Sequence, residues 1–80
     1  MVQAYIIILT EAGAADDVAR QVAQIAGVTS ADRVLGPYDV IARVRAENTE
    51  ELGKVVYAQV QAVPGITRAL TCPVNQGGER

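Results

Sequence analysis

The two halves of this 80-residue chain carry the same short pattern at a constant offset of 38 residues. Ile25-Ala26-Gly27-Val28-Thr29-Ser30-Ala31 in the first half aligns with Val63-Pro64-Gly65-Ile66-Thr67-Arg68-Ala69 in the second. The same offset places Val2-Gln3-Ala4 over Val40-Ile41-Ala42. In each half an apolar strand precedes an amphipathic helix, and glycine separates that helix from a further strand. The repeat therefore predicts two βαβ units, which restricts the chain to few topologies.

The first unit is expected to form a strand over residues 2–10, a helix over 15–26 and a strand over 28–35. Residues 6–9 are a continuous apolar run, Ile-Ile-Ile-Leu, typical of a strand that is covered on both faces. The helix has two aspartates in its first turn, where negative charge suits the helix dipole, and an apolar stripe along one side. The second strand is polar, which places it at an edge of the sheet.

The two units meet at Gly36-Pro37-Tyr38-Asp39. Proline presets φ for the first corner of a type I turn, so we predict such a turn here, with Val34-Leu35 paired to Val40-Ile41 as a hairpin. A turn alone needs neither the tyrosine nor the aspartate. Two interpretations of Asp39 are open: it bonds local backbone amides, or it binds a ligand.

The second unit should contain a strand over residues 39–46, a helix and a last strand over 66–74. Asn48 and Glu51 form a capping-box pair that opens the helix, and Pro64-Gly65 ends it. We expect residues 1–74 to be the folded domain. The polar residues 75–80 are expected to be a frayed tail.

With right-handed crossovers, the two units predict an α+β fold, the ferredoxin-like βαββαβ sandwich. Its four-stranded antiparallel sheet has two helices on one face, and the strands over residues 2–10 and 39–46 are central. Tyr5, Ile7, Leu9 and Ile41 then lie on the face without helices. A bare apolar patch of this size indicates an interface. We therefore expect these four residues to join a homodimer sheet to sheet, in a dimeric α+β barrel-type assembly.

Composition excludes several classes of site and partner. With no histidine and one cysteine, the chain has no transition-metal cluster and no intrachain disulfide, and we expect no cofactor. Seven basic and nine acidic residues offer no basic stripe, so direct nucleic-acid binding is not expected. The apolar run is too short for a membrane span or a signal peptide, which predicts a cytoplasmic protein with no membrane partner. A domain this small buries only roughly 60–65 % of its unfolded surface, so oligomerisation is expected to supplement the core.

Three features together carry a family resemblance that covers residues 2–74. They are the apolar first strand, a Gly-x-Tyr-Asp-hydrophobic turn at Gly36-Pro37-Tyr38-Asp39-Val40, and a proline-glycine entry to the last strand at Val63-Pro64-Gly65-Ile66-Thr67-Arg68. By these features the chain resembles the effector-sensing domain of the leucine-responsive regulatory protein/asparagine regulator (Lrp/AsnC) family, also called the RAM domain for regulation of amino-acid metabolism.

The resemblance implies a ferredoxin-like dimer that assembles into a ring of dimers. It also implies a small effector, usually an amino acid, bound between dimers, and it places Gly36, Tyr38, Asp39 and Thr71 at effector-contact positions. Where the family often has Thr-x-Thr in the last strand, this chain has Ala69-Leu70-Thr71.

The usual regulator of this family carries an N-terminal helix-turn-helix domain. This sequence starts at Met1 directly in the first expected strand, so the resemblance implies a stand-alone sensing domain. Such a domain would act in transcription regulation without binding DNA itself, and a full-length Lrp/AsnC regulator is an expected partner.

Two other functions are open on the sequence. Dimeric ferredoxin-like domains of this size include small monooxygenases and isomerases, although such chemistry needs a proton shuttle or a bound cofactor and this chain has no histidine. The other alternative is a structural oligomerisation module that binds no ligand.

Overall fold

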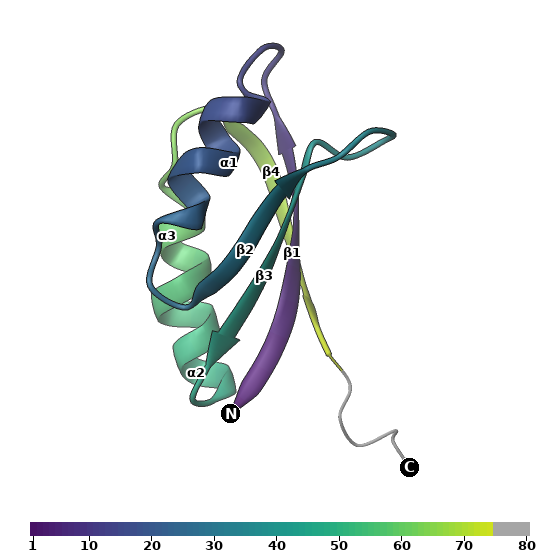
Figure 1. Cartoon of the computed structure of the whole chain (residues 1–80). Helices are drawn as coiled ribbons and strands as arrows, with labels where there is room; N and C mark the ends of the chain where they lie inside the picture. The colour runs from purple at the N-terminus through teal and green to yellow at the C-terminus, as the bar shows by residue number, and fades with distance from the viewer. Residues whose placement is uncertain (75–80) are drawn as a thin grey trace.

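The computed structural model describes residues 1–74, which form a four-stranded antiparallel sheet with helices against one of its faces (Figure 1). The elements in chain order are β1 (Val2–Thr10), α1 (Ala15–Ala23), β2 (Val28–Arg33), β3 (Val40–Ala46), α2 (Thr49–Glu51), η1 (Leu52–Tyr57), α3 (Ala58–Gln61) and β4 (Ile66–Pro73). The strand order is β2-β3-β1-β4. The predicted ferredoxin-like fold is therefore confirmed, with β1 and β3 central and the polar β2 at an edge. The predicted tail, residues 75–80, lies outside the described residues.

The core lies between the helices and one side of the sheet. Alternate residues of the two central strands point into it, because successive side chains of a strand face opposite ways. The fully buried side chains come from both central strands and from both helical segments of the chain; the largest are Ile6, Ile8, Val18, Val22, Val40, Val44 and Val60. Among the described residues no polar or charged residue is buried, so the core is held by apolar packing.

The second helix is one continuous helical stretch built from α2, η1 and α3 (Figure 1). Its central segment, η1, has π-helical hydrogen bonding. Asn48 caps its start, since the side-chain Oδ1 accepts a hydrogen bond from the Glu51 N–H at 2.7 Å. The Glu51 carboxylate in turn accepts from the N–H of Glu47 at 2.7 Å, one residue earlier than the predicted capping box requires.

The turn between β2 and β3 differs from the predicted type I turn. Arg33 pairs with Val40, and the ladder closes with a 2.9 Å hydrogen bond from the Val34 N–H to the Asp39 carbonyl. The predicted pairing of Val34-Leu35 with Val40-Ile41 is therefore wrong by two positions, and Leu35 is 95 % exposed. The physical reason is that the Asp39 N–H donates across to the Ile8 carbonyl at 3.1 Å, so it does not close a tight turn.

Two other elements end earlier than predicted. α1 stops at Ala23, because the N–H groups of Gln24 and Ile25 bond carbonyls three residues back, those of Gln21 and Val22. Such bonds tighten the last turn of a helix and end it. β2 stops at Arg33, where the chain leaves the sheet for the turn.

The cap of the second helix yields a stability prediction. Asn48→Ala removes the acceptor for the Glu51 N–H, so the free energy of unfolding should fall by about 1 kcal/mol. Asn48→Asp keeps an acceptor at the same place and should unfold close to wild type. Urea titrations at one protein concentration measure both variants. Equal loss in the two variants would show that the cap does not stabilise this helix.

Candidate functional site

The sheet face turned away from the helices, called here the open face, carries an apolar row. Ile7 of β1 pairs with Ile41 of β3 on one side and with Leu70 of β4 on the other. Tyr5 and Leu70 are each 40 % exposed, and Ile7, Leu9 and Ile41 are partly exposed. The structure thus brings together all four residues predicted for the interface. Sequence reasoning missed Leu70, although the alternation of the last strand next to β1 would have placed it on this face.

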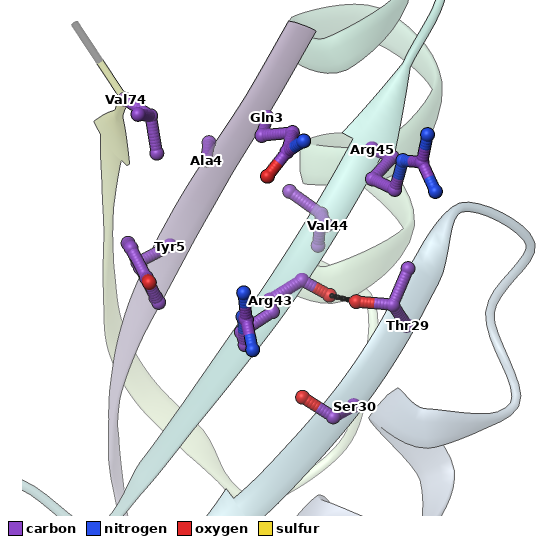
Figure 2. Close-up of a pocket in the computed structure, with 9 residues that line it drawn as sticks. All are labelled: Gln3, Ala4, Tyr5, Thr29, Ser30, Arg43, Val44, Arg45 and Val74. Carbon is purple, nitrogen blue, oxygen red and sulfur yellow. Dashed lines mark hydrogen bonds between the residues drawn. The ribbon is translucent and has the colours of Figure 1, made fainter.

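Arginines border the apolar row on the open face. The Arg43 guanidinium lies over the Tyr5 ring, 5.7 Å from its centroid, and the two side chains face each other at one end of a hollow of about 340 Å³ (Figure 2). The Thr29 hydroxyl donates to the Arg43 carbonyl at 3.1 Å. In the described part of the chain no carboxylate forms an ion pair with Arg43 or Arg45. An apolar centre with a charged border is the composition of a protein–protein interface.

The turn that carries Gly36, Tyr38 and Asp39 projects beyond the sheet (Figure 1). Gly36 is exposed and Tyr38 is 39 % exposed, whereas Asp39 is half-buried. The Asp39 Oδ2 accepts a hydrogen bond from the Thr10 N–H at 2.8 Å and so ties the turn to the end of β1. One oxygen of the Asp39 carboxylate therefore has a structural role. It accepts from a backbone amide of β1, whereas the sequence suggested the backbone amides of the turn itself.

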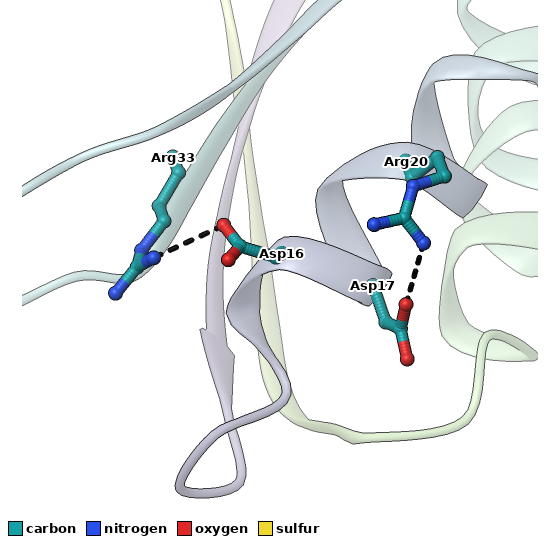
Figure 3. Close-up of polar contacts among 4 residues, drawn as sticks. All are labelled: Asp16, Asp17, Arg20 and Arg33. Atoms are coloured by element: carbon teal, nitrogen blue, oxygen red, sulfur yellow. Dashed lines mark hydrogen bonds and ion pairs between the residues drawn. The ribbon is translucent and has the colours of Figure 1, made fainter.

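A polar hollow of about 260 Å³ lies beside Asp39. Its lining includes the backbone after β1 and an ion pair between Arg33 of β2 and Asp16 of α1, whose Nη1 and Oδ1 atoms are 3.0 Å apart (Figure 3). Both side chains are more than half exposed, at 57 % and 68 %, so the pair contributes little to stability. Within residues 1–74 no group of three or more potential metal ligands comes together.

Thr71 lies on the helix side of the sheet, in a hollow of about 390 Å³ between β4 and the second helix. This β4 hollow is lined almost entirely by apolar surface, from the residues Thr49, Leu52, Gly53, Tyr57, Ala69, Leu70, Thr71 and Pro73. The Tyr57 hydroxyl donates to the Ala69 carbonyl at 2.5 Å and accepts from the Gln61 Nε2 at 3.3 Å.

The Thr71 Oγ1 is buried and has no hydrogen-bond partner, alone among the buried side-chain polar atoms of the described residues. Buried hydroxyls are normally paired, and an unpaired one is destabilising by roughly 1–3 kcal/mol. The sequence indicated Thr71 as a site residue only through the family resemblance. The hollow and the unpaired hydroxyl depend on how the helix packs on β4, which no local pattern predicts.

Within one copy of the chain, Thr71 lies apart from the other predicted effector residues, which are in the turn. Thr71 pairs with Ile6 in the middle of β1, whereas Asp39 bonds Ile8 and Thr10 toward its end. The turn also projects away from the sheet (Figure 1). A single small ligand that touches Thr71 and the turn would therefore have to lie between two copies.

The family assignment follows from a comparison with known families. A model of the Lrp/AsnC ligand binding domain matches residues 3–76. The chain belongs to this family. An uncharacterized HTH-type transcriptional regulator of Pyrococcus furiosus is 38 % identical over 55 residues, and one of Pyrococcus horikoshii is 36 % identical over 55 residues. Each alignment covers 69 % of this chain and 37 % of the regulator, so this Lrp/AsnC domain corresponds to little more than a third of those relatives.

Solved structures agree with this assignment. A protein from Thermus thermophilus superposes with a TM-score of 0.88 and 28 % identity, and the match covers the whole of both chains. Escherichia coli AsnC superposes with a TM-score of 0.84 over 94 % of this chain and 51 % of that one; at 22 % identity this shows the shared fold. Within the part of the Lrp/AsnC domain that the structure describes, no helix has the length and hydropathy to cross a membrane.

The open face of this Lrp/AsnC domain yields a prediction about assembly. Ile7→Glu places a charge in the middle of the apolar row, where a partner sheet would bury it, so the variant should dissociate or unfold. Gln3→Glu is the matched control, because Gln3 is exposed on the same face of β1 near the end of the strand. Sedimentation and thermal melting measure both. An Ile7→Glu variant that sediments and melts like wild type would contradict the proposed interface.

Proposed function

We propose that this chain is a small-molecule sensing and oligomerisation domain that acts in transcription regulation. The observation that carries the proposal is the β4 hollow, an apolar pocket beside a buried hydroxyl that lacks a partner, in a member of a ligand binding domain family. A ligand in the hollow supplies the hydrogen bond that Thr71 lacks once the Thr71 side chain turns toward it, because the hydroxyl is buried in the chain alone. Ligand binding then removes an energetic penalty of the empty domain, which favours the bound state.

The proposed effector is a free amino acid held between dimers. Within this proposal the ligand contacts Thr71 of one copy and the turn with Gly36, Tyr38 and Asp39 of another copy. The separation of these two groups within one chain supports a shared site of this kind. A transcriptional regulator of Neisseria meningitidis, solved as a complex with L-Met, has the same fold with a TM-score of 0.80 and 18 % identity, over 99 % of this chain and 53 % of that one.

The proposed assembly is a sheet-to-sheet homodimer that associates further into a ring of dimers in the cytoplasm. The apolar row of the open face supports the first contact. In this proposal, a full-length Lrp/AsnC regulator that co-assembles with this domain contacts the DNA. DNA binding draws on several contacts between basic side chains and phosphates, and this chain carries a net charge of −2. The relatives that are similar to it in sequence are HTH-type transcriptional regulators, which supports a regulatory role over a catalytic one.

Thr71→Val tests the hollow directly. Valine has nearly the same shape and lacks the unpaired hydroxyl, so the variant should be at least as stable as wild type. Amino-acid binding should weaken by roughly 0.5–1.5 kcal/mol, the net contribution of one hydrogen bond. Calorimetric titration and thermal melting measure the two effects. If Thr71→Val binds amino acids as tightly as wild type, the hydroxyl is not part of the site.

Asp39→Asn tests the turn. The asparagine oxygen can still accept from the Thr10 N–H, so stability should change little. If the carboxylate also contacts the α-ammonium group of an effector, losing the charge should weaken binding by roughly 1.5–3 kcal/mol, about one to two decades in affinity. Calorimetric titration of amino acids into both proteins measures this. Equal affinities would leave Asp39 with its structural role alone, and a wild-type chain that binds no amino acid would favour the ligand-free oligomerisation module.

A further inference from the structure

The basic side chains of the described chain fall into two groups. Those outside the open face all form ion pairs, which are Arg20 with Asp17, Arg33 with Asp16 and Lys54 with Glu50. Those on the open face are Arg43, Arg45 and Arg68, and within residues 1–74 none of them has a carboxylate partner. A chain with a net charge of −2 therefore gathers its unpaired positive charge on one face of its sheet.

The sheet offers little negative charge to these arginines. Its four strands contain a single acidic residue, Asp32 of β2. Asp32 pairs with Ile41 and so lies beside the apolar row, and it forms no ion pair with any of residues 1–74. Any counter-charge for the open-face arginines therefore has to come from outside the sheet.

Two of the three arginines line one hollow. Arg43 and Arg45 are two residues apart on β3, so their side chains leave the same face of the sheet. Both line the hollow of about 340 Å³ described above, called here the arginine hollow, together with the polar side chains of Gln3, Tyr5 and Ser30 (Figure 2). The two guanidinium groups point to different sides, and because both residues are exposed, each can turn toward an anion between them. A hollow with charge of one sign raises the local concentration of counter-ions.

The neighbouring strands hold Arg43 at this hollow. The register of β2 against β3 shifts between Val28 and Ser30, so Thr29 is the extra residue of a β-bulge. Its hydroxyl donates to the Arg43 carbonyl at 3.1 Å. On the other side of β3, the Tyr5 ring lies 5.7 Å from the Arg43 guanidinium. A cation–π contact of this kind positions the guanidinium and leaves its charge without an anionic partner.

We propose that the arginine hollow binds a small oxyanion of the phosphate class. The planar guanidinium group matches the oxygens of a phosphate with two parallel N–H donors, and such charge-assisted hydrogen bonds are the strong ones. Two guanidinium groups also favour an anion that carries close to two negative charges over a single carboxylate. The arginine hollow shares no lining residue with the β4 hollow, so this site is additional to the proposed effector site.

The bound anion has a role in the homodimer. Two open faces that pack together bring the unpaired arginines of both copies to one interface, and like charges across an interface oppose association. A phosphate in each arginine hollow offsets this repulsion. Phosphate should therefore strengthen the dimer, a consequence that rests on the proposed sheet-to-sheet assembly.

Calorimetric titration of inorganic phosphate into the wild-type chain tests the site, with ionic strength held constant by sodium chloride. Phosphate should bind saturably, and acetate, which has one negative charge, should bind about tenfold or more weakly. Acetate that binds as tightly as phosphate would overturn the assignment to the phosphate class. Phosphate that does not saturate the chain would overturn the site.

Substitutions separate the arginine hollow from general attraction of anions. Arg43→Gln and Arg45→Gln each remove one guanidinium, so the affinity for phosphate should fall by about tenfold or more. Arg68→Gln is the matched control, because it removes the same charge from the same face and Arg68 does not line the hollow. Its affinity should stay close to that of wild type. Equal losses in all three variants, or no loss in either hollow variant, would overturn the site.

Arg43→Lys and Arg45→Lys keep the test decisive if a glutamine variant fails to fold. Lysine retains the positive charge and lacks the planar fork, so each variant should bind phosphate severalfold more weakly than wild type. Wild-type affinity in both lysine variants would overturn the role of the guanidinium groups.

Sedimentation equilibrium tests the consequence for assembly. The dimer dissociation constant of wild type should be severalfold lower in phosphate than in chloride of equal ionic strength. Arg43→Gln in the same two buffers controls for the general effect of phosphate on apolar association and should show a smaller difference. Phosphate that binds without lowering the dissociation constant would overturn the role in assembly. A wild-type chain that is monomeric in both buffers would instead overturn the proposed homodimer.

Discussion

The two-sided burial of β1 is the constraint on which the rest of the structure depends. Ile6 and Ile8 are completely buried under the helices, and Ile7 between them faces the opposite way. One layer of helices can cover one face of a four-stranded sheet. The other side of β1 then keeps an apolar row that extends to Ile41 and Leu70 in the neighbouring strands. A second sheet is a cover that matches an apolar row of this kind, so the proposed dimer depends on the same strand that builds the core.

Because successive side chains of a strand face opposite ways, two separate surfaces of the domain arise. The open face is available for a partner sheet, while the free edge of β4 and the β4 hollow lie on the helix side, against η1. Leu70 borders both surfaces, because it pairs with Ile7 in the apolar row and also lines the β4 hollow. Under the proposed function, the dimer contact and the effector contact would therefore meet at this residue. The projecting turn provides a third surface, and its tie from Asp39 to Thr10 keeps it in a fixed place relative to β1.

Sequence patterns predicted the fold because the features that decide it are local and repeated. Each of these features specifies its own element, and all of them are consistent with one fold. They are the two βαβ halves, the apolar run of β1 and the cap at Asn48. The register of the turn was predicted wrongly, since a hydrogen bond from Asp39 to Ile8 joins residues far apart in the chain. The residues predicted for an interface followed from the alternation of side chains along the strands, and the structure places them on one face of the sheet. The β4 hollow could not be predicted, because it arises where a π-helical segment packs against a strand edge, and only the resemblance pointed to Thr71.

Hydrogen exchange measured by mass spectrometry tests the central claim most directly. The chain is compared with and without saturating leucine, at a concentration where the assembly is intact. The account predicts slower exchange of backbone amides in residues 49–57 and 69–73, which border the β4 hollow, and in residues 35–39 of the turn. Protection confined to the open-face strand β3, or exchange that leucine does not change at all, would contradict the assignment of the effector site.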